Sequence, residues 1–215
     1  MKTKAILVAI VTGSVMFTSC LPQISIKAGK GDEATIFFST GFSPATARTL
    51  QTAVGTDENT PLFNKNDILM VLNSAGATNT SASLPSPTEI STEGTLPELS
   101  KHPLSMTGLI KKTKKSLTLT LGAKQISAFY ELLNDDAKSY LDLMMLPALI
   151  GEKMSKTEYR DLLASMYGPN FADEIVNGKL TIALSSPDGK KSVKKSVNLG
   201  ELLTSEEEMS WSLEF

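Results

Sequence analysis

The stretch that decides the fold is SLTLTLGAKQISAFYELL, residues 116–133, in which the spacing of apolar residues changes midway. Its first part alternates leucine with serine or threonine, which is the two-residue period of a strand with one buried face. In its second part, Ile126, Phe129 and Leu133 recur at three- and four-residue spacing, which is the period of an amphipathic helix. A strand that leads directly into a helix indicates a domain that contains both kinds of element.

The segments on the N-terminal side add strands and helices to this unit. Residues 24–26 and 35–38 predict a hairpin of two strands around a glycine-containing turn. Ser43 and Pro44 then predict the start of a helix, because serine caps free amide groups and proline suits the first helical position. A second helix is predicted over about residues 65–75.

The segments on the C-terminal side complete the pattern. Residues 123–177 predict several amphipathic helices, one of which begins with the Ser-x-x-Glu capping pattern of Ser155 and Glu158. The remaining residues return to two-residue alternation and predict strands at 180–184, 193–199 and 209–215. Strands, then helices, then strands predict an α+β fold: a largely antiparallel sheet with several amphipathic helices packed on one face.

Composition limits the chemistry that the chain can perform. Of its 215 residues, 41% are hydrophobic and 20% are charged, which is typical of a globular protein. Cys20 is the only cysteine and His102 the only histidine, so an intramolecular disulfide, a thiolate cluster and a histidine-rich zinc site are excluded. His102 precedes Pro103 and is interpreted as an ordinary surface residue.

The first 20 residues have the organisation of an export signal. Lys2 and Lys4 form a short positive region, residues 5–11 form an apolar run, and the small residues Thr18 and Ser19 follow. This order describes a secretory signal peptide. The apolar run is too short for a membrane span, which needs about 20 residues.

The segment Phe17-Thr18-Ser19-Cys20 resembles the lipobox of bacterial lipoproteins, although Phe17 stands where leucine is usual. The resemblance covers only the first 20 residues. It implies cleavage before Cys20 and acylation of the Cys20 thiol, and the two or more acyl chains of this class anchor a protein durably. It also implies a place in the bacterial envelope. Because Leu21 is not acidic, the outer membrane is favoured over the inner one.

These observations predict a chain organised in three parts. Residues 1–19 are a signal peptide, residues 20–33 are a lipidated N-terminal tether with a first short strand, and residues 34–215 are a single α+β domain. Residues 77–103 are rich in Ser, Thr and Pro, and they are interpreted as a long loop, an interrupted edge strand or a partly mobile segment. They are also the best candidate for a subdomain boundary.

The predicted function is that of a membrane-anchored, exported lipoprotein with a non-enzymatic binding or scaffolding role. No catalytic constellation, cofactor or metal is expected. The expected partners are the membrane, through the N-terminal lipid, and either an envelope protein or a hydrophobic small molecule. Removal of the signal peptide takes away two lysines and no acidic residue, so residues 20–215 contain 19 basic and 23 acidic residues. This negative charge argues against nucleic-acid binding, which needs a basic face.

Four lysines form one candidate contact site. They lie between strands predicted at 106–110 and 116–122, and they are Lys111, Lys112, Lys114 and Lys115. They either touch anionic lipid headgroups or form a solvated turn that blocks pairing at a strand edge.

A stripe of methionine and tyrosine residues on the predicted helices forms the other candidate site. It either lines an adaptable hydrophobic pocket or fills the core beneath the sheet. Its candidate ligand-binding members are Tyr130, Tyr140, Met144, Met145, Tyr159 and Met166. A pocket would make the protein a carrier or sensor of a hydrophobic ligand. A carboxylate-dependent hydrolase is the second alternative, because a catalytic carboxylate pair can be distant in sequence.

Overall fold

The computed structural model describes residues 22–53, 55–57, 59–142 and 145–215. These residues form an α+β fold with nine helices, a six-stranded sheet and a three-stranded sheet. The predicted fold class is therefore confirmed. The division of the strands between two sheets was not predicted.

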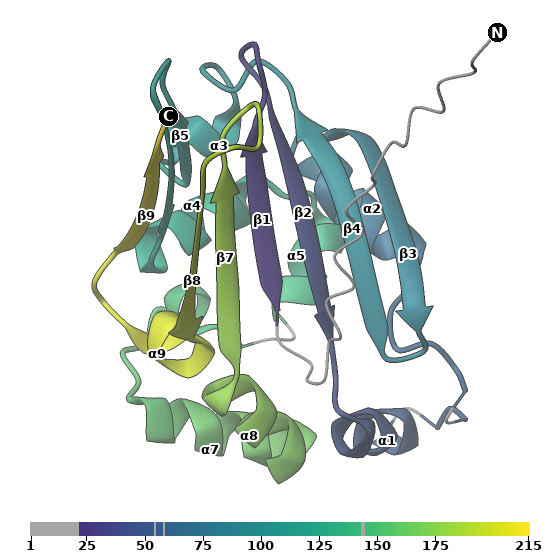
Figure 1. The fold of residues 1–215 in the computed structure, drawn as a ribbon. Helices are drawn as coiled ribbons and strands as arrows, with labels where there is room; N and C mark the ends of the chain where they lie inside the picture. The colour runs from purple at the N-terminus through teal and green to yellow at the C-terminus, as the bar shows by residue number, and fades with distance from the viewer. Residues whose placement is uncertain (1–21, 54, 58, 143–144) are drawn as a thin grey trace, which may run out of the picture.

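The large sheet has the strand order β3-β4-β2-β1-β7-β8. Its strands are β1 (Gln23–Ala28), β2 (Ala34–Gly41), β3 (Thr78–Ser86), β4 (Glu89–Leu96), β7 (Lys179–Ser185) and β8 (Ser192–Asn198). All neighbouring pairs are antiparallel except β1 with β7. The predicted N-terminal hairpin is confirmed, with Ile26 opposite Ile36. Strand β1, which the sequence analysis grouped with the tether, therefore lies in the middle of the sheet (Figure 1).

The small sheet has the order β5-β6-β9, with β5 (Ile110–Lys112), β6 (Ser116–Leu121) and β9 (Met209–Glu214). The strand predicted from alternating leucines is confirmed as β6, and the C-terminal strand is confirmed as β9. The strand predicted from residue 106 was wrong. Helix α3 (Pro103–Met106) occupies that position, and the strand begins only at Ile110.

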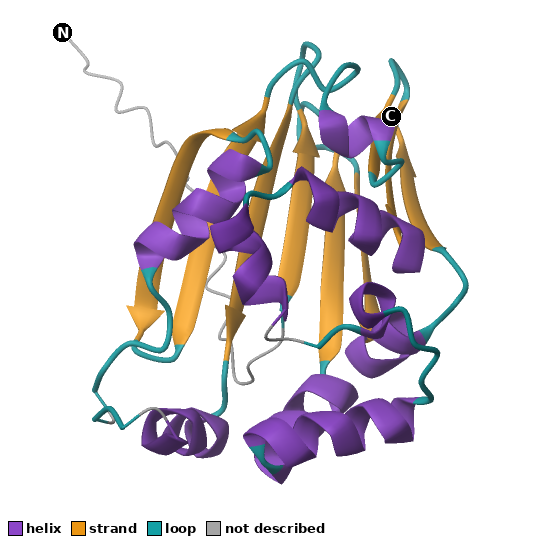
Figure 2. Cartoon of the chain, turned by 180° about the vertical axis from the view of Figure 1, so that it is seen from behind, coloured by secondary structure: helices purple, strands orange, loops and turns teal. Residues whose placement is uncertain are grey.

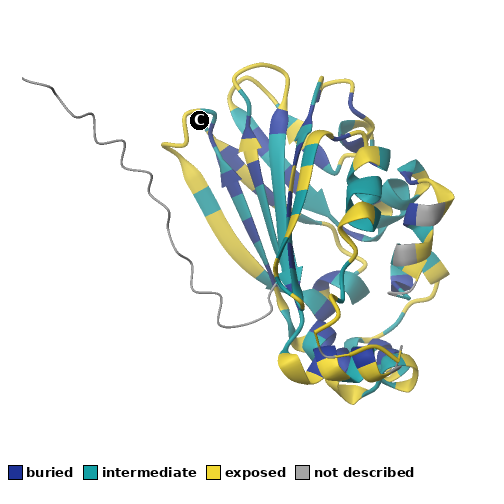
Figure 3. Cartoon of the chain, turned by 90° about the vertical axis from the view of Figure 1, so that its right-hand side faces the viewer, coloured by how far each residue is buried: buried dark blue, intermediate teal, exposed yellow. Residues whose placement is uncertain are grey.

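The helices cover one face of the large sheet and one of its ends (Figures 2 and 3). Besides α3 they are α1 (Pro44–Ala53), α2 (Lys65–Ser74), α4 (Ala123–Leu132), α5 (Asp135–Asp142), α6 (Pro147–Ile150), α7 (Lys156–Tyr167), α8 (Pro169–Asn177) and α9 (Leu199–Thr204). Packing on one face is thus confirmed. Helix α9 was missed, because the sequence analysis expected only strands in that region.

Strand alternation supplies the main core. Ile26, Ile182 and Leu184 point toward the helices and are at most 1% exposed. Each such side chain stabilises the fold by about 1.5–3 kcal/mol relative to an exposed position. Ser25, at an alternate position of β1, lies on the open face of the sheet and is only half-buried.

Residues 77–103 belong to the large sheet over most of their length. They form the hairpin of β3 and β4 and then lead to α3. Strand β4 pairs with β2 from Ala34 opposite Leu96 to Gly41 opposite Glu89. Strand β3 lies at the sheet edge and pairs with β4 with two register irregularities. The interpretation as an interrupted edge strand therefore fits β3, but the inner strand β4 was not predicted.

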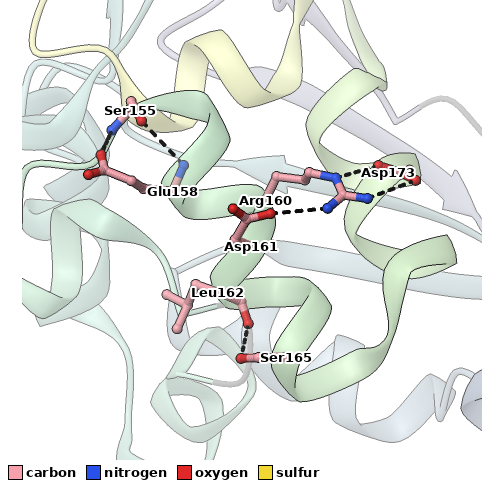
Figure 4. Close-up of polar contacts among 7 residues, drawn as sticks. All are labelled: Ser155, Glu158, Arg160, Asp161, Leu162, Ser165 and Asp173. Atoms are coloured by element: carbon pink, nitrogen blue, oxygen red, sulfur yellow. Dashed lines mark hydrogen bonds and ion pairs between the residues drawn. The ribbon is translucent and has the colours of Figure 1, made fainter.

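Polar contacts hold α7 at its start and against α8 (Figure 4). The predicted capping box is confirmed: the Ser155 amide donates to Glu158 Oε2 at 2.7 Å, and the Glu158 amide donates to Ser155 Oγ at 3.2 Å. Arg160 Nε donates to Asp173 Oδ1 of α8 at 2.8 Å. These bonds fix the end of the molecule at which β1 and β7 begin.

We expect acid to destabilise the fold through these carboxylates. The Ser155 amide lowers the pKa of Glu158, and the hydrogen bond from Arg160 lowers the pKa of Asp173. Because these pKa values lie below the unfolded values of about 4, the stabilisation is present above that pH and is lost as pH falls through the folded values.

Urea unfolding at neutral pH and at about pH 3 measures this effect, because pH 3 lies below the unfolded carboxyl pKa values. The unfolding midpoint should be lower in acid. In Glu158→Gln, which cannot ionise at this position, the difference between the two midpoints should be smaller. A wild-type midpoint that does not change with pH would contradict the expectation.

Candidate functional site

The predicted lipidation site, Cys20, comes just before β1 in the sequence. Cys20 itself is outside the described residues, but it precedes Gln23 by three residues. Three Cα–Cα steps of 3.8 Å allow at most about 11 Å between Cys20 and Gln23. A lipid on Cys20 would therefore hold the domain by the end of the sheet at which β1 begins (Figure 1). The described part of the chain contains no helix that is long and apolar enough to cross a bilayer.

The four predicted lysines lie at the other end of the sheet. They occupy the β5–β6 hairpin, and Lys111, Lys114 and Lys115 are exposed. Lys112 Nζ donates to the carbonyl of Gly31, which lies in the turn between β1 and β2. The hairpin tip is therefore next to the point where β1 ends (Figure 1).

The described members of the Met/Tyr stripe do not share one pocket. Tyr159 is 0% exposed and packs with Leu163 and Phe171 in a core cluster of α7 and α8, and this burial raises the pKa of its hydroxyl. Met166 of the same helix is 59% exposed. Tyr130 of α4 lies elsewhere, with Lys138 Nζ 5.0 Å from its ring centre.

Of the other stripe residues, only Met145 is described together with its side chain. Met145 follows α5 with a φ of 46°, in the left-handed region. Tyr140 belongs to α5, but its side chain is outside the described part, as is the whole of Met144. For the described residues, the core interpretation fits Tyr159, and Met166 is a surface residue.

His102 is buried, so its interpretation as a surface residue was wrong. The residue is 5% exposed. Its Nδ1 accepts a hydrogen bond from the Leu104 amide at 3.2 Å and caps α3, while Nε2 lies 3.3 Å from the carbonyl oxygen of Gly76. Nδ1 as acceptor leaves the ring proton on Nε2, which donates to Gly76. Gly76 has a φ of 84°, and a Cβ there would lie 2.7 Å from Nε2, so glycine allows this contact. Both ring nitrogens are thus used structurally.

An open groove of about 650 Å³ lies between α3, α4 and the small sheet. Exposed apolar surface on one side comes from Met106, which is 81% exposed. On the other side, Gln125 Nε2 donates to Glu208 Oε1 at 2.9 Å. The lining residues are Pro103, Met106, Thr107, Gly108, Thr120, Lys124, Gln125, Ala128, Leu132 and Glu208.

The groove combines a buried amide with charged groups at its rim. Gln125 is 3% exposed, and its Oε1 has no hydrogen-bond partner within the described structure. A buried acceptor without a hydrogen-bond partner destabilises a fold by about 1–3 kcal/mol. A Cβ on Gly122 would lie 3.2 Å from this oxygen, so the oxygen faces the backbone at Gly122. Thr107 Oγ1 donates to the Leu104 carbonyl. The groove lining therefore mixes apolar, polar and charged groups.

No protein-family model matches the chain, and a comparison with characterised proteins finds no significant match. Within the described ranges, no three His, Cys, Asp or Glu side chains converge to hold a metal ion. The groove was missed by the sequence analysis because its residues come from four separate segments with no shared motif.

Proposed function

We propose that this chain is an exported bacterial lipoprotein, anchored through Cys20, whose folded domain binds or scaffolds a partner in the envelope without catalysis. The observation that carries the proposal is the position of the sole cysteine. It ends a signal-like segment and lies three residues before Gln23 of β1. A lipid at that position would be coupled directly to a central strand, with the outer membrane as the favoured location.

The arrangement of polar groups supports a binding role rather than catalysis. His102 uses both ring nitrogens in structural contacts, and Glu208, in the groove, accepts a hydrogen bond from Gln125. The alternative of a hydrophobic carrier gains no support from Tyr159 or Met166, which lie in the core and on the surface respectively. The groove instead mixes apolar and charged residues.

Replacement of Cys20 by serine tests the anchor. In a bacterial host supplied with labelled fatty acid, the wild-type protein should carry the label, begin at Cys20 by mass spectrometry and remain with the membrane fraction. Cys20→Ser should carry no label and lose stable membrane attachment, because the acylated thiol is gone. Leu21→Ala, which leaves the thiol in place, is the matched control and should remain labelled. A wild-type N-terminus without acyl groups would refute the proposal.

A further inference from the structure

Strand pairing brings lysines from four separate segments to one end of the large sheet. Lys30 lies in the β1–β2 turn, Lys101 follows β4, and Lys190 with Lys191 lies in the β7–β8 turn. These join the four lysines of the β5–β6 hairpin, because β1, β4 and β7 all end at this side (Figure 1). We call these eight residues the lysine end.

The lysine end carries a charge opposite to that of the remaining chain. Five acidic side chains lie among its eight lysines, so its net charge is +3; they are Asp32, Glu33, Glu98, Asp188 and Glu214. Since residues 20–215 total −4, everything outside this end carries −7. With a Debye length of about 8 Å at physiological ionic strength, a partner would respond to this local charge rather than to the total.

Nearby contacts hold this end together and engage the carboxylates of Asp32 and Glu98. Asp32 accepts hydrogen bonds from the amide and the hydroxyl of Ser100, and the Leu99 amide donates to the Asp32 carbonyl at 2.8 Å. Glu98 forms an exposed ion pair with Lys101 at 3.8 Å. In the β5–β6 and β7–β8 segments, Lys112 is half-buried and contacts Gly31, and the exposed lysines are Lys111, Lys114, Lys115, Lys190 and Lys191.

The lysine end is also remote from the predicted anchor. Strand β1 begins next to the tether, and its six residues separate Gln23 from Ala28 by about 17 Å at 3.3 Å per residue. The tether reaches at most about 11 Å from Gln23. A domain that stands upright on the membrane that holds Cys20 presents the lysines away from that membrane.

We propose that the lysine end docks onto a second anionic lipid bilayer, facing the one that holds Cys20. The orientation in this proposal rests on the proposed function. All eight basic residues are lysines, which act as hydrated point charges on flexible stems and lack the planar fork with which arginine recognises one phosphate. Lysines spread over four turns suit a flat array of headgroups better than a single small anion.

Vesicle capture tests the proposal with the chain of residues 20–215. The Cys20 thiol is coupled to a maleimide lipid in neutral phosphatidylcholine vesicles, and labelled vesicles containing phosphatidylglycerol are added. Co-sedimentation should show capture of the anionic vesicles but not of neutral ones. Capture should weaken strongly between about 0.1 M and 1 M salt, where the Debye length shrinks from about 10 Å to 3 Å.

Two sets of substitutions locate the contact. Replacing Lys111, Lys112, Lys114 and Lys115 by glutamine should weaken capture at least about tenfold, since each lysine near an anionic surface contributes about fivefold. That set also removes the Lys112 contact to Gly31. A second set, Lys30→Gln with Lys190→Gln and Lys191→Gln, leaves Lys112 in place and should also weaken capture. The matched control removes the same number of charges elsewhere, at Lys65, Lys153, Lys156 and Lys179, and should leave capture unchanged.

Three results would overturn the proposal. They are equal capture of neutral vesicles, equal loss of capture in the control set, and absence of capture of anionic vesicles by protein whose circular dichroism shows it to be folded. Binding of soluble polyglutamate without capture of anionic vesicles would assign the surface to an acidic polypeptide instead and also overturn it. Chemical coupling replaces natural acylation here, so a failed anchor and a failed lysine contact are separate results.

Discussion

Replacing Ile26 with alanine is expected to lower the free energy of unfolding by about 2–4 kcal/mol. The side chain is 1% exposed and faces Ile36 on β2 and Leu184 on β7 across the centre of the large sheet. Truncation removes buried methyl and methylene groups and leaves a cavity that paired strands on both sides prevent from closing. Because β1 begins three residues after Cys20, weakening this strand would also weaken the link between the proposed anchor and the domain.

Chemical denaturation followed by circular dichroism measures the effect of Ile26→Ala. The control is Ser25→Ala on the open face of the same strand, which should change the unfolding free energy by less than about 0.5 kcal/mol. The comparison tests the alternation of buried and open positions along β1. Equal effects of the two substitutions would show that β1 has a different register or is not central to the fold.

Replacing Tyr159 with alanine is expected to lower the free energy of unfolding by about 3–5 kcal/mol, which is the range for other large aromatic truncations in protein cores. The ring is 0% exposed and is packed among residues of α7 and α8, including Leu163 and Phe171. Truncation of a tyrosine that lined an open ligand pocket would destabilise the fold far less, because it would only enlarge a space already open to solvent. The size of the loss therefore separates a core residue from a pocket residue.

Met166→Ala on the same helix is the matched control for this prediction. Its side chain is 59% exposed, so the change should be within about 0.5 kcal/mol. Guanidinium unfolding of both variants provides the measurement. A cost below about 1 kcal/mol for Tyr159→Ala would contradict the core assignment and return the hydrophobic-carrier hypothesis to consideration.

Elements were predicted correctly where the spacing or capping pattern that specifies them lies within a few neighbouring residues. The alternating leucines predicted β6, and the Ser155 and Glu158 pair predicted the capping box at the start of α7. Ser43 and Pro44 likewise marked α1. Such signals report side-chain spacing and capping, which need no information about distant residues.

The features that the sequence did not predict depend on contacts between residues far apart in the chain. His102 caps its own short helix, but its burial depends on the Gly76 carbonyl, 26 residues earlier. Helix α9 is only six residues long, and a Cβ on its Gly200 would lie 2.5 Å from the carbonyl oxygen of Val176, so this helix depends on close packing against α8. The candidate groove also joins segments that no local pattern connects.

The sequence by itself therefore determined the α+β class and most of the elements, because period and caps are short-range properties. The address at Cys20 stays a prediction. Only the tertiary structure decided that β1 is a central strand, that Tyr159 lies in a core, and that lysines from four segments meet at the end of the large sheet where β1 ends. The physical reason is strand pairing: hydrogen bonds between remote segments set which turns share an end of the sheet, and periodicity carries no record of them.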